Sequence, residues 1–75
     1  MVEDPQQPLL NQVSALIKEM NNRNGGKDFM DQGDREEHAN IMKGIYAVKT
    51  SKDVKSIQRT LDAWKRDLKQ RFPPR

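Results

Sequence analysis

The chain has 75 residues, a net charge of +3, no cysteine and a mean hydropathy of −1.04. A chain of this length forms at most one domain, and without disulfides or thiolate metal sites its stability depends on helix packing or association. No apolar run approaches the roughly 20 residues of a membrane span, and residues 1–5 lack the basic and apolar regions of a signal peptide. We therefore expect an intracellular, cytoplasmic protein that does not enter membranes.

Basic and acidic residues are unevenly distributed along the sequence. Residues 1–48 hold five basic and eight acidic side chains, whereas residues 49–75 hold nine basic and three acidic side chains. A chain divided in this way can attract an anionic partner through its C-terminal part. The same charges also suit two solvated helix surfaces of different composition, because exposed charges are usual on proteins.

The first helix is predicted over residues 8–22. Pro8 suits its first position, where no backbone N–H is required. Gly25 and Gly26 end it, since glycine readily adopts the left-handed conformation that follows a helix C-terminus. The apolar residues recur every three or four positions, which places them on one face of the helix: Leu9, Leu10, Val13, Leu16, Ile17 and Met20.

The connection at residues 23–33 is the longest between the predicted helices, and Phe29 and Met30 are its only large apolar residues. We expect these two side chains to pack over the open end of the helices. The alternative is a partner-binding tip, because loops often carry binding residues.

The second helix is predicted over residues 34–48. Asp34 and Glu37 match a capping box, in which two side chains three positions apart bond backbone N–H groups of the first turn. Gly44 inside the helix costs about 1 kcal/mol relative to alanine, which indicates close approach by another part of the bundle or by a partner. The apolar side of the helix consists of Ile41, Met42, Ile45, Tyr46 and Val48.

The third helix, predicted over residues 52–71, has the strongest pattern. Thr50 is the expected N-cap, with Asp53 three residues later. Phe72 extends the apolar side of the helix, and the two prolines that follow end it. The apolar residues alternate between spacings of three and four, as in a heptad seam: Val54, Ile57, Leu61, Trp64 and Leu68.

These segments predict an all-α fold, a small three-helix bundle that runs up, down and up. We expect a single helical domain over residues 1–75, with residues 1–7 and 73–75 frayed. The pattern places four residues in the core: Leu16, Ile45, Leu61 and Trp64.

The third helix also carries a patterned polar face. At about 100° per residue, four basic side chains lie on one line opposite the seam and a fifth lies close to it. We call these residues the basic ridge: Lys52, Lys55, Arg59, Arg66 and Lys69. A helix laid along phosphates would present such a line. Asp62 interrupts the ridge, and no aromatic residue on that face can stack on bases.

The sequence provides no pattern for catalysis or metal binding. Residues 28–39 align with a calcium loop through Gly33, but three ligand positions hold unsuitable residues: Met30, Gln32 and Ala39. His38 is the single histidine, and the sequence contains neither a serine-nucleophile motif nor a phosphate-binding loop. We therefore expect no enzyme activity, no metal and no cofactor.

The sequence favours a small helical protein-interaction module, such as an adaptor, a regulator or an assembly subunit. Trp64 at a seam position is a core residue unless the seam is partly open, in which case it would be an interface hot spot. The residues expected to contact a partner protein are Phe29, Met30, Trp64 and Phe72. The alternative is a nucleic-acid-binding protein that uses the basic ridge on phosphates. A third hypothesis is self-association through the heptad seam.

Overall fold

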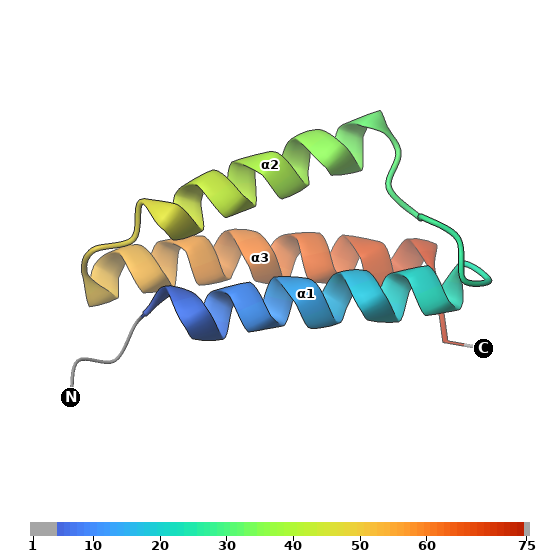
Figure 1. Cartoon of the computed structure of the whole chain (residues 1–75), viewed down its shortest axis with the longest axis horizontal. Coiled ribbons are helices and arrows are strands. Elements are labelled where there is room, and N and C mark those ends of the chain that lie inside the picture. Colours follow the sequence, from blue (N-terminus) through green and yellow to red (C-terminus); the bar gives the residue numbers. More distant parts are fainter. Residues whose placement is uncertain (1–4, 75) are drawn as a thin grey trace.

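Three α-helices form the structure, a computed structural model that describes residues 5–74 (Figure 1). They are α1 (Gln6–Arg23), α2 (Gln32–Tyr46) and α3 (Ser51–Arg71). The helices run up, down and up, and residues 5–74 contain no strand. The predicted all-α three-helix bundle is confirmed.

The helix boundaries differ from the prediction by one or two residues. α1 begins at Gln6, so two of the seven N-terminal residues predicted to fray are helical. Pro8 is the third residue of this helix, where a backbone N–H still has no partner within the helix. α2 ends at Tyr46, two residues early, and α3 begins one residue early. The predicted fraying of residues 1–4 and 75 lies outside the described residues.

The N-terminus of α2 is capped by a different pair from the one predicted. Asp31 is the N-cap, and its carboxylate accepts a hydrogen bond of 2.9 Å from the backbone N–H of Asp34. The Asp34 carboxylate in turn accepts one of 3.4 Å from the backbone N–H of Asp31. The predicted box of Asp34 with Glu37 is therefore wrong, because Asp34 reaches back toward the preceding turn.

The predicted N-cap of α3 is confirmed. Thr50 Oγ1 accepts a hydrogen bond of 3.2 Å from the Asp53 N–H, and Asp53 Oδ2 accepts one of 3.1 Å from the Thr50 N–H. Backbone hydrogen bonds from Lys49 and Thr50 hold the pKa of Asp53 below its ordinary value. The capped turn therefore favours an ionised Asp53.

The core lies along the inner faces of all three helices. Each of the four predicted core residues is buried. Tyr46, predicted on the apolar side of the second helix, is instead 61% exposed. The fully buried large side chains come from every helix: Leu9, Met20, Ile41, Ile45, Leu61 and Leu68.

α2 diverges from the other two helices toward its N-terminus (Figure 1). Aromatic rings pack at this end of the bundle: the centroid of Phe29 lies 6.3 Å from that of Trp64 and 5.7 Å from that of Phe72. The centroid of the His38 ring lies 6.1 Å from that of Trp64. Phe29 thus joins the core beside the divergent end.

At the opposite end, α2 and α3 approach each other closely at Gly44. A β-carbon at this position would lie 2.5 Å from Ile57 Cδ1, nearer than real side chains come. The close approach expected from the glycine is therefore made by a side chain of α3 within the bundle.

Truncation of Leu61 tests the position of the seam. Leu61 is fully buried, so Leu61→Ala should lower the free energy of unfolding by about 2–5 kcal/mol through lost burial and the cavity left behind. Urea denaturation of the purified variants measures this change. The neighbouring Thr60 is exposed, and Thr60→Ala should change stability by less than about 0.5 kcal/mol. Equal losses in the two variants would contradict the assigned core.

Candidate functional site

The four apolar residues predicted to contact a partner lie in or against the core. Phe29 is 6% exposed and Trp64 is 5% exposed, while Met30 and Phe72 are half-buried. All four belong to the same packed cluster at the divergent end of the bundle. Little of Phe29 or Trp64 is therefore left for a partner to contact unless this end of the bundle opens.

The heptad seam of α3 is also occupied within the chain. Leu61, Trp64 and Leu68 are buried, and Val54 and Ile57 pack half-buried against the same core. Self-association through the seam would therefore require α3 to leave α1 and α2.

The basic ridge is the predicted site that lies free on the surface. Its five side chains are all exposed, and across residues 5–74 none of them makes a hydrogen bond or an ion pair. From Lys52 to Lys69 the ridge extends over about 26 Å at 1.5 Å per residue. Along this line the five cations face solvent, and Asp62 is the acid that interrupts them.

Asp62, which interrupts the ridge, is engaged on the side that faces α1. Its carboxylate accepts a hydrogen bond of 2.9 Å from Gln58, and Gln58 also pairs at 2.9 Å with Gln12 of α1. The Asp62 side chain therefore lies toward the edge of the ridge that faces α1.

On the other side of the ridge, α2 and α3 enclose two shallow hollows. The larger, of about 370 Å3, is lined by Gly33, Asp34, Glu37, Ala63, Trp64 and Asp67. The smaller, of about 170 Å3, is lined by Gly44, Ala47, Asp53, Ser56, Ile57 and Thr60. The larger lining contains three carboxylates, the smaller contains two hydroxyls and one carboxylate, and neither includes a histidine.

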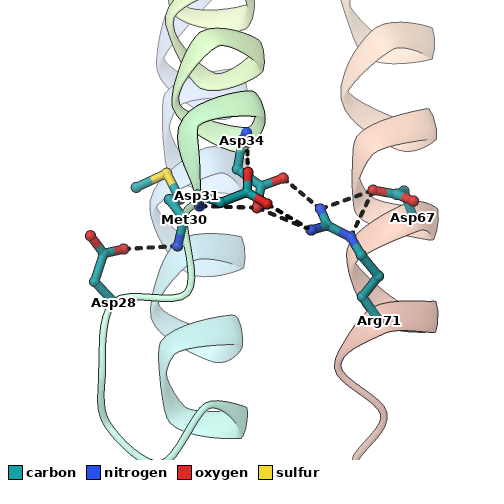
Figure 2. A network of polar contacts seen from close by, with 6 residues as sticks. All are labelled: Asp28, Met30, Asp31, Asp34, Asp67 and Arg71. Carbon is teal, nitrogen blue, oxygen red and sulfur yellow. Dashed lines mark hydrogen bonds and ion pairs between the residues drawn. The ribbon is translucent and has the colours of Figure 1, made fainter.

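An ion-pair network lies beside the larger hollow and joins α2 to α3 (Figure 2). The Arg71 guanidinium donates two hydrogen bonds, of 2.5 and 3.2 Å, to the carboxylate of Asp34. It also contacts the Asp67 carboxylate at 2.9 Å and lies 3.9 Å from that of Asp31. The arginine therefore bridges the first turn of α2 and the last turn of α3.

The network keeps Asp34 ionised although the residue is only 4% exposed. Burial raises the pKa of this carboxyl, but the hydrogen bonds from Arg71 and from the Asp31 N–H, with the positive charge of Arg71, outweigh it. The net effect is a pKa below the ordinary value of 3.8. The hydrogen bond to Asp34 correspondingly raises the pKa of Arg71.

The indole nitrogen of Trp64 is a buried polar atom near the carboxylate of Asp34. It makes no hydrogen bond of normal geometry. The N–H nevertheless lies close enough to the Asp34 carboxylate to contribute a small lowering of its pKa.

Within residues 5–74, no group of three histidine, aspartate or glutamate side chains is arranged to hold a metal ion. No helix in this part of the chain is both long enough and apolar enough to cross a membrane. No protein-family model matches the sequence, and no characterised protein or solved structure is significantly similar to it.

Two features of this surface were missed in the sequence. The pairing of Asp34 with Arg71 joins residues 37 positions apart, and nothing in a single sequence indicates such a contact. The lining of the hollows had a visible signal, because small residues recur at spacings of four and three on α3 beside the ridge: Ser56, Thr60 and Ala63.

Removal of Arg71 tests the network. Arg71→Ala leaves the Asp34 carboxylate buried with fewer donors, so the free energy of unfolding at neutral pH should fall by about 1–3 kcal/mol. Lys69→Ala is the matched control, because Lys69 lies in the same last turn and pairs with no carboxylate in the described chain. It should cost less than about 0.5 kcal/mol. Denaturation of the three proteins in urea gives both values.

The pH dependence provides the second arm of this test. The pKa of Asp34 in the folded protein lies below 3.8. The contribution of its carboxylate to the free energy of unfolding is therefore present above about pH 4 and is lost as the pH falls toward the folded pKa. The Asp34→Asn variant should therefore lose less of its free energy of unfolding than the wild type as the pH falls below 4. The part of the loss that is due to Asp53 should remain. An unchanged acid profile would contradict the role of Asp34.

Proposed function

We propose that the chain is a non-catalytic helical interaction module that binds an acidic partner protein through the basic ridge. The observation that supports this proposal is that five exposed cations share one face of α3 without neutralising partners. Binding on this face leaves the core closed, whereas binding through Phe29 or Trp64 does not. An acidic surface on the partner protein would also associate faster with the ridge, because the charges are complementary.

The form of the ridge favours a protein over a nucleic acid. Its basic residues follow a straight, convex helix and recur at spacings of three, four and seven, which suits carboxylates presented by another regular protein surface. No aromatic side chain lies among them to stack on a base.

Nucleic-acid binding is the second candidate, and the same line of cations supports it. Four contacts to duplex phosphates would give a slope of log affinity against log salt of about −3.6. A salt-dependent complex with duplex DNA or RNA, tighter than micromolar at physiological ionic strength, would favour this candidate over the first.

Charge reversal on the ridge tests the proposal. Lys55→Glu with Arg59→Glu should reduce capture of the partner at least tenfold in an affinity pull-down from the source cells, followed by rebinding of the purified partner. The matched control is Lys18→Glu with Lys43→Glu, because both lysines are exposed, lie on the other helices and give the same change in net charge. The control should retain binding.

Nuclease treatment before the pull-down separates the two candidates. A partner protein that remains bound after nuclease digestion, and is lost only in the ridge variant, supports the protein-interaction proposal. Loss of all binding after digestion would favour the nucleic-acid candidate. Equal binding by the ridge variant and the wild type would contradict both.

A further inference from the structure

α3 presents two neighbouring stripes to solvent on the side away from its seam. One is the basic ridge. The other lines the two hollows and consists of Asp53, Ser56, Thr60, Ala63 and Asp67. At 100° per residue, Ala63 lies only about 40° from Arg59 around the helix. The hollows and the ridge therefore form one continuous surface.

The wall on the side of α2 combines small residues with two acids. Gly33 and Gly44 of α2 and Ala47, which follows the helix, line the hollows together with Asp34 and Glu37. Small residues on both walls allow a third backbone to approach closely, within the 8–10 Å that separates packed helices. We call this surface the α2–α3 groove.

We propose that the occupant of the α2–α3 groove is an α-helix of the partner protein, with an acidic edge lying against the basic ridge. This inference rests on the proposed function and adds the chemistry of the partner. The bound helix would become the fourth helix of the bundle, flanked by α2 and α3.

The repeat of the surface is the reason for choosing a helix. Both the ridge and the lining of the groove on α3 recur at spacings of three, four and seven over about 20–26 Å. An α-helix presents side chains with the same period, so successive turns of the occupant meet equivalent positions. An extended peptide has a period of two and would lose this match within a few residues.

The charges on the two sides of the groove determine which side chains the bound helix carries along its two edges. The ridge requires carboxylates along one edge. Most acids of the groove are already engaged, since Asp34 and Asp67 bind Arg71, and Asp53 caps α3. Glu37 has no hydrogen-bond or ion-pair partner within residues 5–74. The second edge of the occupant is therefore neutral or basic, as with flanking charges that set helix orientation in coiled coils.

The hollows provide places for the side chains between these edges. The smaller has Ile57 in its wall and suits an aliphatic side chain. The larger has Gly33 and Ala63 in its lining, and these small residues leave room for a longer side chain of the occupant.

Designed peptides test the inference with the full-length protein. The probe is an 18-residue helical peptide with alanine and leucine on one face, glutamates along one edge and lysines along the other. Two controls replace its glutamates by glutamines, or place two prolines in its centre. Isothermal titration should show the acidic helix binding at least tenfold more tightly than either control, with affinity falling as salt rises.

Substitutions that fill the groove test the contribution of its shape to binding separately from the contribution of the ridge charges. Ala63→Trp should weaken binding of the acidic helix at least tenfold. Ala15→Trp is the matched control because it is also an exposed helical alanine, on α1, and it should bind normally. Ser56→Trp fills the smaller hollow and provides a second block if the first variant unfolds. Thermal melting verifies that each variant is folded.

The outcomes distinguish this inference from the proposed function. Equal affinity for the acidic helix and the proline-containing peptide, or full binding by both tryptophan variants, would overturn the groove inference. The proposed function would then stand if the ridge reversal still abolished capture of the natural partner. Absence of any binding by the acidic helix would also overturn the groove inference.

Discussion

The ion pair between Asp34 and Arg71 constrains how α2 lies against α3. It joins the first turn of α2 to the last turn of α3 at the end where the helices diverge (Figures 1 and 2). α2 cannot slide along α3 without leaving a buried carboxylate unpaired, which is costly. The chain has no disulfide, so this polar contact and the aromatic cluster around Phe29 hold the divergent end together.

This arrangement also decides which part of α3 remains available. The apolar seam is occupied by α1 and α2, and Arg71 fixes the C-terminal turn against α2. The side that carries the basic ridge faces solvent without neutralising partners. A partner can therefore bind α3 without any opening of the bundle. The fold thus separates the apolar seam, which stabilises α3, from the basic ridge that is proposed to act in binding.

Much of the fold was predictable because helical periodicity is a local signal. The spacing of Leu61, Trp64 and Leu68 was enough to orient α3, and the same geometry placed the basic ridge on the opposite face. The capping of α2 was not predictable with the same certainty, because two overlapping acid pairs match the motif. The choice of Asp31 as N-cap goes together with the distant contact of Asp34 to Arg71. The burial of Phe29 likewise depends on packing at the divergent end of α2, which no local pattern records.

The exposed face of α3 is the surface that we propose to bind the partner. A map of backbone amide chemical shifts, recorded as the purified natural partner is added to the isotopically labelled chain, tests this proposal most directly. The largest changes should fall on residues 52–69 of α3, with the signals of the buried core little affected. Changes concentrated in residues 24–31 or on α1, with α3 unaffected, would contradict the proposal.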